Sequence, residues 1–184
     1  MGFRPPVLLS EKPTEVSSSS PEARIFEIIS FSILKNHYKN TKVYIGYSVE
    51  NLRTEYLTLY KTGRTNANDG GIDFVMRPLG RFFQVTEVNE YSKYLLDIEK
   101  VMHFPVTFVV KTSSKKLEVL RDLEKYIEKK SNGMCVIEKR YHDAIEEIIT
   151  INELQEWMCS LADLDIDNVI RDIDRYYKLE MNID

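Results

Sequence analysis

An aspartate at the start of an apolar segment is the residue in this sequence that most clearly suggests chemistry. Asp73 follows two glycines, and its neighbours in the run IDFVM are otherwise apolar. Burying a lone carboxylate is costly unless a partner shares its charge. A divalent cation is one such partner, and magnesium prefers oxygen ligands of this kind. Asp73 is therefore a candidate metal ligand.

A second oxygen donor follows Asp73 at a spacing that fits a β-hairpin. Residues 72–76 read as a strand, RPLG as a turn, and residues 81–88 as the returning strand. That strand carries Gln84 and Thr86 on one face, because side chains alternate along a strand, with Glu87 on the other. The hairpin should bring Asp73 beside Gln84. Gly70 and Gly71 allow backbone or a phosphate to approach closely. We expect Mg²⁺ between Asp73 and Gln84.

The rest of the chain must supply the elements that position this hairpin. Helices are predicted at about 20–37, 91–103 and 113–130, and strands at 42–49, 56–62, 105–111 and 134–138. The remainder, to residue 184, reads as two or three helices. Strands that alternate with helices indicate an α/β fold with a mixed central sheet flanked by helices and a helical C-terminal segment.

Three parts are expected along the chain. Residues 1–19 hold four serines and three prolines and suggest a flexible leader. Residues 20–138 form the core. Residues 139–184 form an acidic helical segment that either packs on the core or provides a dimer surface. Its apolar residues are Leu154, Trp157, Met158, Leu161, Leu164, Ile166, Val169, Ile170 and Ile173.

The net charge of −4 hides an uneven distribution. Residues 143–184 hold 12 of the 29 acidic residues and 3 of the 25 basic ones, which leaves 17 acids and 22 bases before them. A basic body can meet phosphate, whereas a solvated helical surface explains the same balance without any ligand. The interleaved charges of the helix at 114–130 favour a solvated face over a DNA grip.

Cysteine usage and hydropathy limit the class of protein. Cys135 and Cys159 form no CxxC motif, so neither a disulfide framework nor a zinc site is expected, and a cytoplasmic location is the default. The N-terminus lacks the long apolar core of a signal peptide. No apolar run is long enough for a membrane span.

The motif resembles a known family. Residues 68–73, NDGGID, followed by Gln84-x-Thr86, are similar to branches of the PD-(D/E)xK nuclease superfamily that carry a GDGGID-like stretch and then QxK. The longer string YKTGRTNANDGGIDFVM…GRFFQVTE looks most like the HaeII-type type II restriction endonucleases. The predicted order of helix, strands, helix and strand agrees with that family's core. The resemblance covers roughly residues 20–138, about two-thirds of the chain.

The resemblance implies a restriction-endonuclease-like core and magnesium-dependent, site-specific hydrolysis of phosphodiesters in double-stranded DNA. Carried over by position, Asp73 is the metal aspartate, Gln84 the second ligand, and Glu27 the acid of the first helix. The family's lysine position holds Thr86, whose hydroxyl orients water but supplies no positive charge. Another cation would have to substitute, and Lys61 is one candidate. Three further cations lie within plausible reach: Arg64, Arg81 and Lys93.

The loop before Asp73 is the best candidate for DNA contacts. Arg64, Asn66 and Asn68 have the side chains that make paired hydrogen bonds to guanine and adenine, and Arg77 in the hairpin turn is placed to touch phosphate. Because type II restriction enzymes commonly act as dimers on palindromes, the resemblance also implies a homodimer. Two alternatives remain open: a non-catalytic DNA-binding or assembly module on a degenerate nuclease core, and a hydrolase of another phosphodiester such as RNA.

Overall fold

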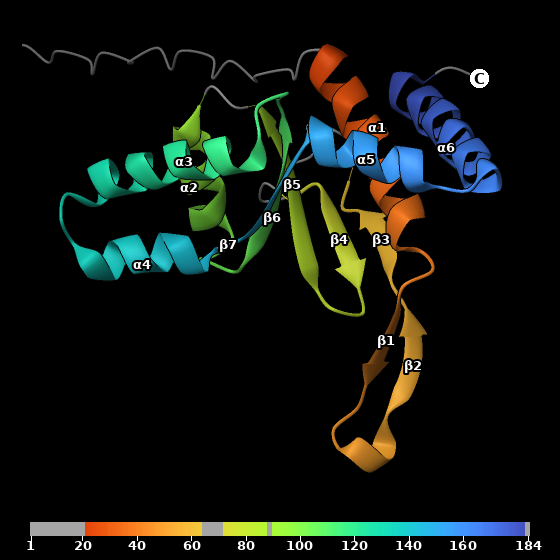
Figure 1. Cartoon of the computed structure of the whole chain (residues 1–184), viewed down its shortest axis with the longest axis horizontal. Helices are drawn as coiled ribbons and strands as arrows, with labels where there is room; N and C mark the ends of the chain where they lie inside the picture. Colours follow the sequence, from red (N-terminus) through yellow and green to blue (C-terminus); the bar gives the residue numbers. More distant parts are fainter. Residues whose placement is uncertain (1–20, 64–71, 88–89, 183–184) are drawn as a thin grey trace, which may run out of the picture.

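The computed structural model describes residues 21–63, 72–87 and 90–182. Its centre is a mixed sheet of five strands in the order β3-β4-β5-β6-β7, with helices on both faces (Figure 1). The strands are β3 (Thr58–Lys61), β4 (Phe74–Arg77), β5 (Arg81–Glu87), β6 (Val106–Lys111) and β7 (Ile145–Thr150). The first three pair antiparallel, and β5, β6 and β7 pair parallel. The α/β class with a mixed, helix-covered sheet is thus confirmed.

One helical layer is built from both ends of the chain. It contains α1 (Pro21–Tyr38), α5 (Ile151–Ser160) and α6 (Asp163–Met181). Phe31 of α1 packs against Phe74 of β4 and Tyr176 of α6, with ring centroids 5.1 and 4.9 Å apart. Leu154 and Val169 complete this apolar cluster from α5 and α6. The C-terminal helices therefore pack on the core.

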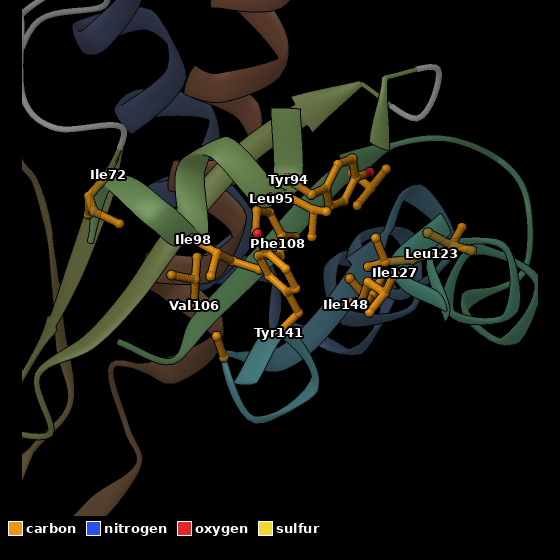
Figure 2. Close-up of a cluster of buried hydrophobic side chains, with 13 residues drawn as sticks. Ile72, Tyr94, Leu95, Ile98, Val106, Phe108, Leu123, Ile127, Tyr141 and Ile148 are labelled. Carbon is orange, nitrogen blue, oxygen red and sulfur yellow. The ribbon is translucent and has the colours of Figure 1, made fainter. Parts of the chain in front are cut away.

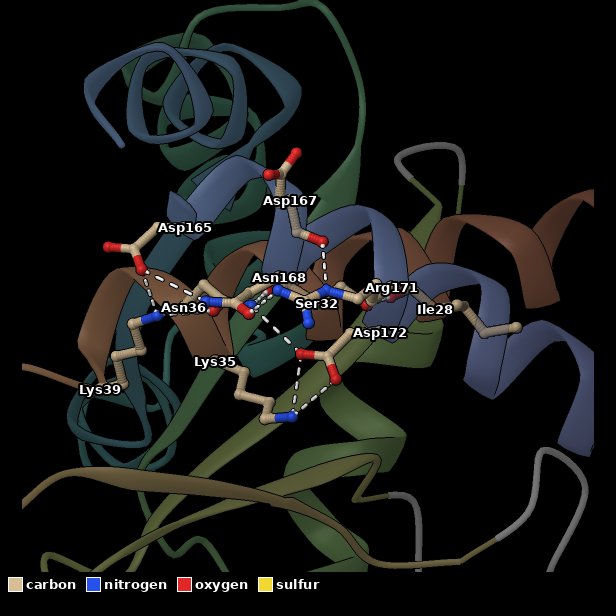
Figure 3. Close-up of polar contacts among 10 residues, drawn as sticks. All are labelled: Ile28, Ser32, Lys35, Asn36, Lys39, Asp165, Asp167, Asn168, Arg171 and Asp172. Atoms are coloured by element: carbon tan, nitrogen blue, oxygen red, sulfur yellow. Dashed lines mark hydrogen bonds and ion pairs between the residues drawn. The ribbon is translucent and has the colours of Figure 1, made fainter. Parts of the chain in front are cut away.

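Ion pairs fasten α6 to α1 beside that cluster (Figure 3). The Nζ atom of Lys35 lies 2.8 Å from Asp172 Oδ1, and Asn36 donates to the same carboxylate at 3.2 Å. Lys39, the residue directly after the end of α1, pairs with Asp165. These contacts fix the register of the two helices, because each lysine meets one aspartate.

The second layer covers the opposite face of the sheet. It contains α2 (Tyr91–Lys100), α3 (Lys116–Ser131) and α4 (Cys135–Asp143). Figure 2 shows its core, where Tyr94 and Ile98 of α2 and Leu123 of α3 gather around Phe108 of β6. All four side chains are fully buried. Two such layers explain why the β6 run VTFVV is buried along its whole length.

A two-stranded ribbon projects from this body. It consists of β1 (Lys42–Ile45) and β2 (Arg53–Tyr56), joined through the 3-10 helix η1 (Val49–Asn51), and it pairs with no strand of the main sheet (Figure 1). Leu57 N donates to Thr41 O at 3.0 Å and closes its base.

Two sequence predictions were wrong. Residues 134–138 were expected to be a strand, but they open α4, where Val136 and Ile137 are exposed rather than buried in a sheet. Residues 145–150 were expected to be helical, but they form β7. Their two glutamates are typical of the exposed face of a helix. The segment forms a strand because it pairs with β6 and buries Ile148 and Ile149.

The other predicted elements are confirmed with small shifts of their ends. The helices predicted near 20–37, 91–103 and 113–130 are α1, α2 and α3, and the strands predicted at 42–49, 56–62 and 105–111 are β1, β3 and β6. Among the described residues, the helices include none that is both long and apolar enough to cross a membrane.

Candidate active site

The predicted hairpin forms and brings Asp73 to the strand that carries Gln84. Strand β4 begins directly after Asp73, and Phe74 pairs with Phe83. Asp73 N donates to Phe83 O at 3.0 Å, and Val85 N donates to Asp73 Oδ2 at 2.7 Å. Asp73 therefore bridges the backbone on both sides of Gln84. The site begins at this end of the hairpin.

The carboxylate of Asp73 is held by the protein itself. Its Oδ2 accepts the Val85 N–H, which is a charge-assisted hydrogen bond. Its main-chain oxygen accepts from Thr62, from N at 3.0 Å and from Oγ1 at 3.1 Å. A cation is thus an additional partner for Asp73 rather than the one that makes its burial tolerable.

Gln84 contributes an oxygen that lacks a partner. Its Oε1 atom is buried and accepts no hydrogen bond from any described residue, while its Nε2 makes a long contact of 3.4 Å to Val85 O. A buried, unpaired carbonyl oxygen is costly, by about 1–3 kcal/mol, and an ordered water or a bound ion is the usual partner in such a case. A hard cation would satisfy it.

The remaining candidate site residues lie on different faces of the sheet. Phe83 and Val85 pack into the cluster beneath α1, so alternation turns Gln84 and Thr86 toward the α2 side. Thr86 is 9% exposed and stands beside Val110 of β6. Thr86 therefore shares a face with Gln84, as the sequence predicts.

Glu27 and Lys61 meet on the α1 side. Glu27 Oε1 lies 2.8 Å from Lys61 Nζ, and the two side chains are only 8% and 13% exposed. Lys61 is the last residue of β3 and pairs with Phe74, the residue after Asp73. Helix α1 thus places Glu27 at the end of β3, next to Asp73. The structure joins two predicted site residues, Glu27 and Lys61, at the strand end next to Asp73.

Of the other proposed substitutes for the missing lysine, Arg81 lies elsewhere. Arg81 stands at the opposite end of β5, where its guanidinium contacts Glu146 at 3.3 Å and Glu147 at 2.5 Å. Lys93 pairs with Glu90 on the surface of α2. The expectation that Arg81 reaches the metal site is therefore wrong, because strand direction places Arg81 at the other end of β5. The expectation for Lys93 stays a prediction.

Sequence reasoning missed one lysine near this end of the sheet. Lys111 ends β6 beside Glu87, and its Nζ lies 3.4 Å from Glu87 and 3.6 Å from Glu22 of α1. Lys111 is one residue out of phase with the Thr86–Val110 pair, so it faces α1 rather than Gln84. Only the strand register reveals this placement.

The predicted DNA contacts are described only in part. Arg77 is exposed at the end of β4, where it pairs with Thr58. Arg64, Asn66 and Asn68, together with Gly70 and Gly71, lie outside the described residues.

The donor set fits a hydrated magnesium ion better than a metal held by several carboxylates. The described residues contain no group of three histidine, cysteine or acidic side chains arranged to hold a metal. Asp73 and Gln84 offer two hard oxygens, and magnesium commonly keeps several waters alongside one or two protein ligands. The unpaired Gln84 oxygen is the observation that supports the fit.

Comparisons with protein-family models, with curated proteins and with solved structures find no match to this chain.

Proposed function

We propose that this chain is a magnesium-dependent, site-specific DNA endonuclease of the PD-(D/E)xK type, most similar to the HaeII-type type II restriction endonucleases. One observation carries the proposal: the hairpin β4–β5 holds the Asp73 carboxylate against the backbone beside Gln84. The order α1, β3, β4, β5, α2, β6 around that hairpin agrees with the core that the motif implies.

Each residue has a role in this proposal. Asp73 and Gln84 would hold Mg²⁺ through their side-chain oxygens, and the ion would supply an activated water as the nucleophile. Lys61 is proposed to supply the positive charge that Thr86 lacks from the strand end beside Asp73, although Lys61 stands on the α1 side of the sheet and Gln84 on the α2 side. Glu27 positions Lys61, since the two already form a buried ion pair. Thr86 orients water through its hydroxyl.

We propose that the DNA-binding surface lies around the same hairpin. Arg64, Asn66 and Asn68 are proposed to contact bases and Arg77 to contact phosphate, because the chain segment that carries the first three leads directly into Asp73. We further propose a cytoplasmic restriction-system protein that acts on double-stranded DNA as a homodimer.

A cleavage assay tests the proposal. Purified protein is incubated with mixed-sequence duplex DNA and Mg²⁺, and discrete fragments are expected. Asp73→Asn should abolish them and Lys61→Met should reduce cleavage by about 10²-fold or more, by analogy with the loss of one charge-stabilising donor. Asp122→Asn, an exposed acid on α3, is the matched control and should cut normally. If no Mg²⁺- or Mn²⁺-dependent fragments form, the endonuclease proposal is refuted.

Two observations favour a second function, a non-catalytic DNA-binding or assembly module. The lysine position holds Thr86, and Gln84 faces the side of the sheet opposite the Glu27–Lys61 pair. Such a module would bind DNA without magnesium and with strong salt dependence. A gel shift in EDTA that weakens steeply with salt, without cleavage under any divalent ion, selects this function.

A further inference from the structure

The projecting ribbon of residues 42–56, here called the β arm, contacts the body near its base, where half-buried Val43 packs against the core cluster beneath α1, and its tip projects away from the body (Figure 1). Strands β1 and β2 pair only with each other in the order Lys42↔Tyr56 to Ile45↔Arg53. Every residue from 42 to 56 is exposed or half-buried. An isolated two-stranded hairpin is only marginally stable in water, so an arm of this kind gains stability when a partner covers it.

The β arm exposes several large apolar side chains. Tyr44 is 67% exposed, Tyr47 fully exposed and Tyr56 52% exposed, and Val49 and Leu52 add apolar area at the tip. At about 200 Å² for each tyrosine, these three side chains alone present about 450 Å². Two copies together approach the roughly 1,000 Å² that a specific interface needs. Apolar patches of this size on projecting elements mark interaction sites.

The charges of the β arm indicate what kind of partner fits. Two bases, Lys42 and Arg53, are balanced by two acids, Glu50 and Glu55, so the arm offers no net attraction to a polyanion. Lys42 lies at the base of the arm and Glu50 at its tip, in η1. An antiparallel arrangement about a two-fold axis sets the base of one arm against the tip of another. Each Lys42 then meets the Glu50 of the other copy, twice per dimer.

We propose that the β arm is a dimerisation element that packs antiparallel against the β arm of a second copy of this chain. Tyr44 and Tyr56 stand on one face of the ribbon and form the centre of the contact. Most of the residues that the sequence suggested for a dimer surface are used inside the chain, since Leu154 and Val169 are buried in the core. This inference does not depend on nuclease activity.

Sedimentation equilibrium of the full chain tests the inference. The unaltered chain should form a dimer at concentrations up to about 100 µM. Replacing Tyr44 and Tyr56 by serine should weaken dimerisation by about 100-fold or more, because central aromatic side chains dominate interface energies. Leu117→Ser, which removes an equally exposed apolar side chain from α3, should leave it unchanged.

A second variant acts on the arm without changing its contact side chains. A Cβ on Gly46 would lie 2.2 Å from Asn51 O, so Gly46→Ala must distort the tip. It should weaken dimerisation while the circular-dichroism spectrum and thermal unfolding of the body are retained. A monomeric unaltered chain, or a dimer that is insensitive to both sets of arm substitutions, overturns the proposal.

A charge exchange tests the antiparallel arrangement. Lys42→Glu and Glu50→Lys should each weaken dimerisation by about tenfold, because each replaces an attraction between two surface charges by a repulsion, twice per dimer. The double variant should return to within about threefold of the unaltered chain, since the pairs are rebuilt with reversed sign. Additive weakening in the double variant excludes the contact. So does an unchanged dimer whose arm variants lose only DNA binding, which would make the arm a nucleic-acid element.

Discussion

Gln84 carries a buried oxygen that no described residue pairs. Neighbouring Asp73 has the opposite situation, because the Val85 N–H already shares its charge at 2.7 Å. A residue kept for stability would be expected to satisfy its own hydrogen bonds. At this position an apolar side chain would favour stability, whereas ligand binding needs an oxygen donor. A substitution of Gln84 can therefore separate the two effects.

We predict that Gln84→Met leaves the free energy of unfolding unchanged or raises it when EDTA is present. Methionine has a similar shape and removes an unpaired polar atom, which is neutral or favourable. In the same variant, the rise in Tm that Mg²⁺ gives the unaltered chain should disappear, since ligand binding stabilises only a protein with an intact site. Thermal unfolding with and without Mg²⁺ measures both effects.

The matched comparison is Gln84→Glu. It keeps an oxygen donor and should retain or enlarge the Mg²⁺-induced rise in Tm, while it lowers stability in EDTA because a buried charge lacks a partner. An equal magnesium response in the methionine variant would show that Gln84 is not a ligand.

At this scale the sequence predicted the pairing of Asp73 with the strand of Gln84 but not the partners of each side chain. Residue type and spacing are enough to place a hairpin, because the turn and the apolar alternation define it. The Val85 N–H, the Glu27–Lys61 pair and the position of Lys111 depend on which elements pack together. No local pattern in the sequence contains that information.

Among the secondary-structure elements, Arg81 joins three strands of the sheet. Its Nε donates to Thr107 Oγ1 at 2.9 Å in β6, and its guanidinium reaches Glu147 in β7. Lys116 at the start of α3 meets the same glutamate at 2.8 Å. Burial tends to raise the pKa of Glu147, but the hydrogen bonds from Lys116 and Arg81 outweigh it and hold that pKa below its usual value.

This network predicts a specific loss of stability in acid. Because the folded-state pKa of Glu147 lies below its unfolded value of 4.5, the stability it contributes is present above pH 4.5 and is lost as the pH falls through the folded pKa. Glu147→Gln should therefore be less stable than the unaltered chain at neutral pH, and this difference should shrink below pH 4.5. Urea unfolding measured from neutral to acidic pH gives both curves.

An exposed glutamate provides the control for this prediction. Glu90→Gln removes a carboxylate that pairs with Lys93 at the surface and should change stability little at any pH. A difference between Glu147→Gln and the unaltered chain that stays constant down to acid would contradict the assigned pKa direction.

The errors in element prediction have one cause. Residues 134–138 hold valine and isoleucine and were expected to be buried in a sheet, yet they lie on the exposed side of α4. Residues 145–150 carry two glutamates directly after Ile145, and both glutamates contact Arg81. In both segments the local composition is ambiguous, and pairing with β6 selects which one becomes the strand.

Across the whole molecule, the two ends of the chain share one core. Helix α1 contacts α6 through Phe31 and Tyr176, and β7 completes the sheet beside β6. A division of the chain at residue 138 cuts through α4 and separates β7 from β6. It also removes α5 and α6, two of the three helices in the layer that contains α1. The acidic charge of the last segment is therefore carried by an integral part of the fold, where Asp165 and Asp172 neutralise lysines of α1.

We predict that a chain truncated after residue 138 does not fold cooperatively. The truncation exposes the buried β6 edge and uncovers Phe31, Leu34 and Phe74, and exposure of a large apolar side chain costs about 1.5–3 kcal/mol. For these three side chains alone the loss is about 4.5–9 kcal/mol, comparable to the net stability of a typical domain, about 5–15 kcal/mol. Near-ultraviolet circular dichroism and urea unfolding should show lost tertiary packing and no sharp transition.

The control replaces the β arm, residues 42–56, by two glycines. Because Leu57 N already meets Thr41 O at 3.0 Å and no residue of the arm is buried, that deletion should keep a cooperative transition. A sharp transition in the truncated chain would instead establish residues 1–138 as a separate domain, with α5 and α6 as an appendage.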